Sequence, residues 1–171
     1  MSRLVDEIKQ AVAAFASCKT TPALIGGLAL AARKVVRATH DVDFLADADD
    51  ADRVHHILPA LDYRCVHRSE DGANDLRDDE GLDLLYAHRA VARRLQSDAA
   101  EHETVMGRLR MISAEGLIGF KLQALVNNPF EDIRALMRAQ RGRLNVVEVS
   151  EYLAMFDRTE MLDGLLAETA D

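Results

Sequence analysis

Residues 37–45 read Arg-Ala-Thr-His-Asp-Val-Asp-Phe-Leu, with two aspartates one residue apart. This stretch alternates as a β-strand does, and alternate side chains of a strand point to the same face. We therefore expect Asp41 and Asp43 to lie side by side while Val42 and Phe44 face a core. Two such carboxylates can share a divalent cation, because Mg²⁺ prefers oxygen ligands. Taken alone, the pattern equally fits a solvent-facing strand edge.

A glycine pair, Gly26-Gly27, lies upstream of this strand. It follows the apolar run Ala23 to Ile25, which predicts a short buried strand, and it precedes a helix predicted from Leu28 to about Val35. The start of a helix exposes unpaired backbone N–H groups and the positive end of the helix dipole, and glycine lets a phosphate approach the main chain closely. The pair therefore fits a triphosphate cradle, or simply a tight turn.

A third acid lies on a later strand. Gly81 to Ala87 alternates, with Leu84 on one face and Asp83 on the other. If this strand lies beside the strand of Asp41 and Asp43, three carboxylates converge. Unpaired like charges at short range repel one another, and Mg²⁺ with oxygen ligands turns that cost into binding. The three acids therefore predict a metal site.

Composition limits the possible functions. The chain has 171 residues, enough for one domain with a sizeable core, and 49% hydrophobic with 29% charged residues is typical of a soluble globular protein. A net charge of −8 argues against a broad electrostatic grip on nucleic acid. An acceptor such as tRNA or DNA would need a local basic face. The candidates for that face are Arg89, Arg93, Arg94, Arg108 and Arg110.

The N-terminal segment shows no pattern of a secretory signal, and the two cysteines show no motif for metal binding or redox chemistry. The N-terminus spreads charge at helical spacing and has no secretory pattern, so we expect a cytoplasmic protein, and no run is long and apolar enough to span a membrane. Cys18 and Cys65 are far apart in sequence and lack a C-x-x-C companion. They are predicted to be reduced thiols without metal or redox duty.

The remaining patterns predict an α+β fold: a small mixed β-sheet flanked by helices, with a helical C-terminal region. One domain is expected over residues 1–171, with an α/β core at about 1–112 and a helical cap at about 113–171. For the rest of the chain the patterns predict a helix at 3–16, helix caps at 47–52 before a third helix, a strand at 63–68, a solvated connection at 69–80, a helix at 90–100, a strand at 104–112, a helix at 114–126 carrying Lys121, a helix at 131–138, and two helices centred on Tyr152 and Leu162.

The order Gly-Gly, helix, Asp-x-Asp on a strand, and a later lone Asp resembles the nucleotidyltransferase superfamily that includes DNA polymerase beta and the antibiotic nucleotidyltransferases. The closer resemblance is to small bacterial proteins of the AbiEii-type toxin group, with the pattern Gly-Gly and then Arg-x-Thr-x-Asp-x-Asp. The likeness spans roughly residues 22 to 140 and includes a helix similar to residues 113–122. The matching residues are Gly26, Gly27, Arg37, Thr39, Asp41 and Asp43.

The resemblance implies that an acceptor hydroxyl attacks the α-phosphate of a nucleoside triphosphate and that pyrophosphate leaves. It implies that Asp41, Asp43 and Asp83 bind Mg²⁺ or Mn²⁺ and that Asp83 accepts the proton of the attacking hydroxyl. The backbone N–H groups of Gly26 and Gly27 would hold the β and γ phosphates.

Three further residues complete the nucleotide-binding set that the resemblance implies: Arg37, Thr39 and Lys121. Arg37 reaches phosphate bidentately or pairs with a nearby acid, and Lys121 neutralises phosphate or snorkels from an apolar helix. The chain departs from the pattern at Asn127–Asp132, which is poor in basic residues where such relatives have more. Gly27 also stands where many members carry serine, so backbone amides would have to suffice.

Two functional hypotheses remain from the sequence. The first is a metal-dependent nucleotidyltransferase acting on an RNA end, a protein hydroxyl or a small molecule, and one form of this hypothesis is a toxin countered by an antitoxin protein. The second is a non-catalytic module of the same fold that binds a nucleotide or a partner. Fold alone does not decide between them.

Overall fold

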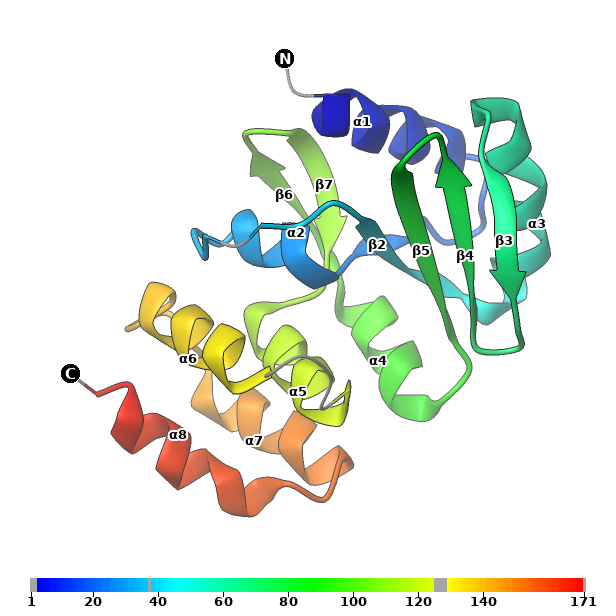
Figure 1. Cartoon of the computed structure of the whole chain (residues 1–171). Helices are drawn as coiled ribbons and strands as arrows, with labels where there is room; N and C mark the ends of the chain where they lie inside the picture. Colours follow the sequence, from blue (N-terminus) through cyan, green and yellow to red (C-terminus); the bar gives the residue numbers. More distant parts are fainter. Residues whose placement is uncertain (1–2, 37, 125–128, 171) are drawn as a thin grey trace. The chain divides into compact units, whose positions relative to one another are not determined.

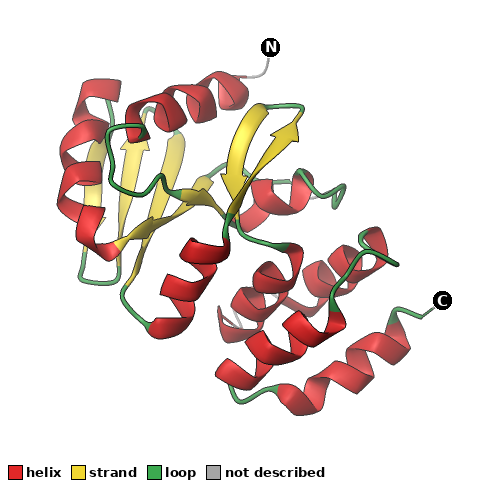
Figure 2. Cartoon of the chain, turned by 180° about the vertical axis from the view of Figure 1, so that it is seen from behind, coloured by secondary structure: helices red, strands yellow, loops and turns green. Residues whose placement is uncertain are grey.

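The computed structural model describes residues 3–36, 38–124 and 129–170. By its internal contacts the chain forms two compact units. The first unit comprises residues 1–29 and 38–112, and the second comprises residues 30–37 and 113–171. Figure 2 shows that the strands belong to the first unit, whereas the described part of the second consists of helices and loops.

A mixed seven-stranded sheet forms the frame of the first unit, in the order β3-β4-β5-β2-β1-β7-β6 (Figure 1). β2 pairs parallel with β5 and antiparallel with β1, and β1 pairs parallel with β7. The hairpins β3-β4 and β6-β7 and the pair β4-β5 are antiparallel. The strands are β1 (Ala23–Leu24), β2 (Val42–Asp47), β3 (Arg64–Arg68), β4 (Gly72–Arg77), β5 (Glu80–Ala87), β6 (Ala100–Thr104) and β7 (Gly107–Met111).

Helices account for most of the remaining described residues. Short 3₁₀ turns flank α3 at Ala48–Asp50 and Leu58–Leu61, and a third precedes α8 at Thr159–Met161. The α-helices are α1 (Arg3–Phe15), α2 (Gly26–Ala31), α3 (Ala51–Ile57), α4 (Ala90–Asp98), α5 (Ala114–Ala124), α6 (Pro129–Ala139), α7 (Val146–Met155) and α8 (Leu162–Glu168).

One face of the sheet carries the core of the first unit. Phe15 of α1 meets Phe44 of β2 edge to face, with ring centroids 5.2 Å apart. Val42, Phe44 and Leu82 are fully buried on this face, as the alternation predicted. The opposite face of β2 and β5 therefore carries the polar side chains, including Asp43 and Asp83.

The second unit is held by close helix packing. Gly119 of α5 lies against Tyr152 of α7, where a Cβ on the glycine would come within 2.7 Å of the tyrosine Cβ. Tyr152 is fully buried. Ser113 caps α5 by accepting a hydrogen bond from the backbone N–H of Gly116 at 2.9 Å.

The predicted fold class is confirmed: the chain is α+β, with a mixed sheet, flanking helices and C-terminal helices. Helix α2 begins at Gly26 rather than Leu28 and ends at Ala31 rather than near Val35. Strand β2 begins at Val42, because the pairing with β5 starts at the partner residues Val42 and Leu82.

The prediction of a solvated connection over residues 69–80 was wrong. Residues 72–77 form β4, which pairs on one side with β3 and on the other with β5. The segment has few strong strand formers, so its conformation is decided by pairing with two neighbours rather than by its own residues. The predicted strand 104–112 likewise belongs to a hairpin, in which β6 occupies residues assigned to the end of a helix or to a loop.

Candidate functional site

Asp43 and Asp83 are register partners on the parallel strands β2 and β5. Their side chains therefore leave the same face of the sheet, as the alternation of the two segments predicted. Asp41 lies one residue before β2, and its carboxylate occupies the space above Gly81: a Cβ on Gly81 would lie 2.4 Å from Asp41 Oδ1. The missing side chain at position 81 thus makes room for the third acid on the same face.

Gly26 lies directly against one of these acids. A Cβ on Gly26 would lie 1.9 Å from Asp43 Oδ2, and the backbone has a φ of +66°, which favours glycine. At the next residue, a Cβ on Gly27 would lie 2.9 Å from the Cβ of Thr39. Both glycines are therefore required by close approach. The interpretation as a tight turn and the interpretation as a cradle beside the acids both agree with this geometry.

Thr39 takes part in shaping the loop before β2. Its hydroxyl donates to the carbonyl oxygen of Asp41 at 3.1 Å, while its Cβ lies close to Gly27. In the structure the hydroxyl therefore fixes the main chain beside the acids. Its predicted role in nucleotide binding stays a prediction.

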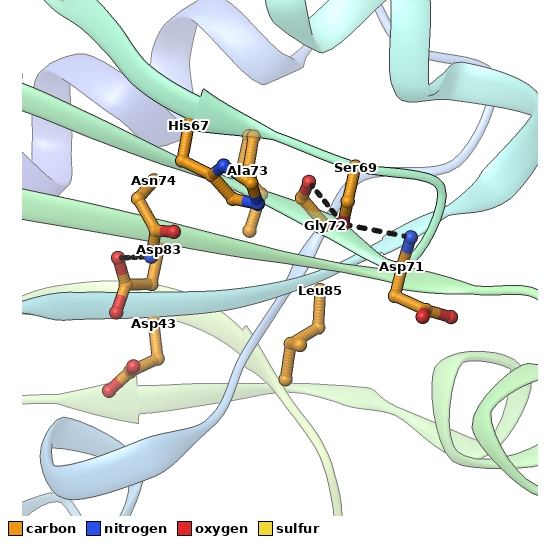
Figure 3. A pocket seen from close by; sticks show the side chains of 10 residues that line it. Asp43, His67, Ser69, Asp71, Gly72, Ala73, Asn74, Asp83 and Leu85 are labelled. Carbon is orange, nitrogen blue, oxygen red and sulfur yellow. Dashed lines mark hydrogen bonds between the residues drawn. The ribbon is translucent and has the colours of Figure 1, made fainter.

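Sequence reasoning missed two residues on β4 and β3 that extend the row of acids. Asn74 is the register partner of Asp83, and its side-chain N–H donates to Asp83 Oδ1 at 2.7 Å. His67 is in turn the register partner of Asn74. Figure 3 shows His67, Asn74, Asp83 and Asp43 in sequence across four strands.

A β-bulge explains why His67 joins this row. The register of β3 against β4 shifts between Cys65 and His67, with Cys65 opposite Asp75 and His67 opposite Asn74. Strict alternation would put Cys65 and His67 on one face, and the extra residue places His67 beside Asn74 on the other. Bulges of this kind leave no clear mark in a single sequence.

A hollow of about 240 Å³ adjoins the acids, and Figure 3 shows the residues around it. Asp43 and Asp83 lie at one side of the hollow. The hairpin between β3 and β4 supplies Ser69, Asp71 and Gly72. The hollow thus runs from the paired acids toward the β3-β4 hairpin.

On the opposite face of β4, Asp75 is buried and only 3% exposed. Its Oδ2 has no hydrogen-bond partner among the described residues. Burial raises the pKa of Asp75, the charge of Asp83 adds to the increase, and His55 and Arg68 oppose it. Burying this carboxyl group costs folding free energy, and Asp75 lies on the face of β4 opposite Asn74.

The phosphate contacts predicted for Arg37 and Lys121 stay predictions. Arg37 lies outside the described residues. Lys121 belongs to the second unit, where its Nζ lies 2.7 Å from Asp132 Oδ2 and both side chains are largely buried. The lysine thus forms an ion pair with α6, an arrangement that neither the phosphate nor the snorkelling interpretation had included.

The predicted basic face is largely engaged in local contacts. Arg94 pairs with Asp98 at 3.3 Å, and Arg108 pairs with Glu103 at 2.7 Å. Arg110 donates to the carbonyl oxygens of Thr21 and Gln96. Contacts of this kind reduce the attraction that these arginines offer a nucleic acid.

Both cysteines are free, as predicted. Burial raises the pKa of Cys18 to about 11, and burial also raises that of Cys65. Both thiols are therefore protonated at neutral pH. Among the described residues, every helix is too short or too polar to cross a lipid bilayer.

The acids fit a divalent cation that also binds a phosphate-bearing substrate. Mg²⁺ is usually held by one or two carboxylates together with substrate phosphates and water, rather than by a cage of protein ligands alone. Asp43 and Asp83 offer two carboxylates from opposed positions. In the described part of the chain, no group of three or more His, Cys, Asp or Glu side chains is arranged to hold a metal by itself. The donor set thus suits a divalent cation that completes its shell with water or with a bound phosphate group.

No protein-family model matches the sequence, and no curated protein sequence matches it either. Solved structures do. The solution structure of the antibiotic-resistance factor ANT(2'')-Ia matches with a TM-score of 0.69 at 20% identity, over 94% of this chain and 95% of that one. The crystal structure of ANT(2'')-Ia in complex with adenylyl-2''-tobramycin gives 0.70 at 20% identity, over 91% and 99%.

A lincosamide antibiotic adenylyltransferase, LnuA, solved with lincomycin bound, matches with a TM-score of 0.61 at 19% identity. This match covers 77% of the present chain and 94% of LnuA. Likeness at such low identity shows the fold and leaves the activity open. The chain has the nucleotidyltransferase fold.

Proposed function

We propose that this protein is a metal-dependent nucleotidyltransferase that moves a nucleoside monophosphate from a nucleoside triphosphate to a hydroxyl acceptor. The observation that carries the proposal is the opposition of Asp43 and Asp83 on β2 and β5, with Gly26 against Asp43. Carboxylates and closely approachable backbone are the two features that a metal-bound triphosphate requires. The fold, shared with adenylyltransferases, agrees with this chemistry.

In the proposed reaction, the acceptor oxygen forms a bond to the α-phosphorus. The bond from that phosphorus to the oxygen bridging to the β-phosphate breaks, and pyrophosphate leaves with the bonding electrons. Asp83 accepts the proton of the hydroxyl. Asn74 holds Asp83 Oδ1, which leaves Oδ2 as the oxygen that receives the proton.

Asp43, Asp83 and Asp41 are the residues that would hold Mg²⁺ or Mn²⁺, which when bound stabilises the negative charge that develops on the phosphate oxygens. The backbone N–H groups of Gly26 and Gly27 are assigned to the β and γ phosphates. Thr39 is assigned to fixing the loop that carries Asp41, since its hydroxyl donates to the Asp41 carbonyl. We keep Arg37 and Lys121 as predicted phosphate contacts.

The test is transfer of label from each nucleoside triphosphate, labelled at the α-phosphate, to components of a cell extract. We expect Mg²⁺-dependent transfer that falls at least about a hundredfold in Asp43→Asn and in Asp83→Asn. Both residues are only partly buried, so thermal unfolding should show that the variants fold. Transfer that persists in the double variant would refute the mechanism.

The AbiEii-type resemblance adds a finer hypothesis, that the chain acts as a toxin countered by a partner protein. Induced expression in a bacterial host should then arrest growth, and Asp43→Asn should relieve the arrest. Tight Mg²⁺-dependent nucleotide binding without turnover on any acceptor would instead support a non-catalytic nucleotide-binding module.

A further inference from the structure

We infer that the outer strand β3 of one copy of this chain pairs with the outer strand β6 of a second copy, so that the sheet continues from one molecule into the next. This inference concerns assembly and does not depend on the nucleotidyl transfer proposed above. It is argued from the two free edges of the sheet, from their opposite charges and from the faces on which the charged side chains lie.

β3 and β6 are the two outer strands of the sheet, and Figure 1 shows them at its opposite ends. Among the described residues, β3 pairs only with β4, and β6 pairs only with β7. Both strands have five residues, and all of these are exposed except Cys65 and Thr104, which are partly exposed. An outer strand presents unpaired backbone N–H and C=O groups, which can form hydrogen bonds with a further strand.

The two outer strands carry opposite charges. β3 reads Arg-Cys-Val-His-Arg and contains no acid, whereas β6 reads Ala-Glu-His-Glu-Thr and contains no lysine or arginine. On paired strands, like charges that lie side by side destabilise the pairing and opposite charges stabilise it. Pairing of β3 with β3, or of β6 with β6, is therefore disfavoured, and pairing of β3 with β6 is favoured.

The β-bulge in β3 brings two of its basic side chains onto one face. Arg64 is the register partner of Leu76, and His67 is the register partner of Asn74. Leu76 and Asn74 are two residues apart on β4, so Arg64 and His67 share a face although they are three residues apart in the sequence. This is the face of the candidate site, because Asn74 is also the register partner of Asp83.

The acidic side chains of β6 lie on the same face of the sheet. Register partners link Phe44 on β2 to Leu24 on β1 and Leu24 to Met111 on β7. Met111 is in turn paired with the first residue of β6. Phe44 packs on α1, so the first residue of β6 lies on that face. The second and fourth residues, Glu101 and Glu103, therefore lie on the opposite face.

The directions of the two strands allow these side chains to meet. Four antiparallel and two parallel pairings connect β3 to β6 across the sheet. An even number of reversals gives both strands the same direction, so a second copy that continues the sheet with the same face pairs its β6 in parallel with β3. In the register that brings Arg64 beside Glu101 of the second copy, His67 lies beside Glu103. The guanidinium then forms an ion pair, and the imidazole can donate a hydrogen bond to the other carboxylate.

Both glutamates already contact Arg108 of their own chain. Arg108 Nε lies 2.7 Å from Glu103 Oε1 and 4.0 Å from Glu101 Oε2. All three side chains are about two-thirds exposed, and ion pairs so exposed contribute little stability. One guanidinium beside two carboxylates also leaves this group with a net negative charge. The two glutamates can therefore accept a further basic group from another molecule.

Pairing of β3 with β6 is heterologous, because the two surfaces that meet are different. Each copy that joins leaves one β3 and one β6 free, so the assembly grows into rings or open chains rather than stopping at a dimer. Where two copies meet, Glu103 of the second copy lies beside His67, which lines the hollow next to Asp43 and Asp83. The second copy thus adds a carboxylate to the border of the candidate site.

The experiment is sedimentation velocity with the 171-residue chain at concentrations from the micromolar to the millimolar range. We expect the weight-average mass to rise with concentration beyond that of a dimer. It should fall again when NaCl is raised from about 0.05 M to about 0.5 M, because salt screens exposed charges. A mass that stays that of the monomer at low salt, or that stops at the dimer, would overturn the inference.

A matched pair of charge-reversal variants identifies the two strands. The first variant carries Glu101→Lys and Glu103→Lys, which makes both outer strands basic. The second carries Arg64→Glu and His67→Glu, which makes both acidic on the shared face. We expect each variant alone to stay monomeric and an equal mixture to reach the mass of the unmodified protein, because every basic strand then meets an acidic one. If either variant assembles alone, or if the mixture stays monomeric, the pairing of β3 with β6 is wrong.

A control variant makes the same change in net charge away from both edges. Glu160→Lys with Asp163→Lys reverses two exposed acids of the second unit and should assemble like the unmodified protein. All the substituted positions are exposed, so thermal unfolding should show that each variant folds. If the control variant also becomes monomeric, assembly depends on net charge rather than on these two strands, and the inference fails.

Discussion

Asp43 on β2 and Asp83 on β5 are register partners on neighbouring parallel strands, so their side chains lie next to each other on one face of the sheet. Parallel pairing in register keeps both carboxylates on the face that is not packed on α1. The arrangement places like charges side by side, which costs stability unless a cation lies between them. This relationship is the physical basis of the proposed activity, and the residues around the pair can be tested one at a time.

Asn74 is predicted to position Asp83. It donates to Asp83 Oδ1 at 2.7 Å and is exposed, so Asn74→Ala should leave the fold intact. Hydrogen bonds to charged groups contribute about 1.5–3 kcal/mol, so kcat should fall about tenfold or more while KM for the nucleotide changes little. Steady-state kinetics measures both constants. Asn74→Asp should be worse than Asn74→Ala because it places another negative charge beside Asp83, and equal rates in the two variants would contradict the prediction.

Gly26 is predicted to be irreplaceable because of Asp43. Gly26→Ala would place a Cβ 1.9 Å from Asp43 Oδ2, at a φ of +66°. The carboxylate must then move, so Mg²⁺-dependent nucleotide binding should be lost, in addition to a cost of about 1–2 kcal/mol for the left-handed backbone. Calorimetry with a nonhydrolysable triphosphate measures the loss.

A second glycine separates the two effects of Gly26→Ala. Gly142 has a φ of +74°, and a Cβ there would meet nothing within 4 Å. Gly142→Ala should therefore cost about 1–2 kcal/mol of unfolding free energy through backbone strain and leave nucleotide binding unchanged. If the two variants lose binding equally, the contact with Asp43 is not the cause.

Gly81 is predicted to matter only because Asp41 lies above it. A Cβ at position 81 would lie 2.4 Å from Asp41 Oδ1, so Gly81→Ala should displace that carboxylate and lower kcat/KM at least about tenfold. In an Asp41→Ala background the obstacle is gone, and Gly81→Ala should cost little more. A double-mutant cycle on kcat/KM measures this coupling, and additive effects would show that Gly81 acts through something else.

The sequence was sufficient for the half of the site built on alternation. Val42, Asp43 and Phe44, and likewise Asp83 and Leu84, take the faces that a period of two assigns them. At Gly26 the residue type predicted a tight turn or the approach of a phosphate, and the structure shows the Asp43 side chain against this glycine. These features depend on local rules, which a single sequence contains.

The other half depends on pairing between distant segments. Asn74 lies in a strand with few strong strand formers. The sequence feature that could have indicated this strand is the length of the predicted connection, because twelve residues is long for a link between neighbouring strands. His67 reaches the site through a bulge, which reverses the alternation of β3. Lys121 pairs with Asp132 on another helix, a contact that helical periodicity alone does not specify.

Asp75 is predicted to make stability depend on pH. Its pKa in the folded state is raised by burial above the ordinary value of 3.8, so its favourable contribution is complete below that pH and is lost as the pH rises through the folded pKa. Asp75→Asn removes the ionisation. Near pH 7 the variant should therefore have a free energy of unfolding about 1–3 kcal/mol above that of the unmodified protein and should unfold at a higher temperature. This difference in stability should shrink toward pH 4. Calorimetric scans from pH 4 to pH 7.5 measure the difference in stability.

The control is Asp62→Asn, at an exposed position, which should shift stability by less than about 0.5 kcal/mol. An advantage of Asp75→Asn that stays constant across this range would mean that lost packing or hydrogen bonding, rather than a buried charge, governs the site beneath Asn74 and Asp83.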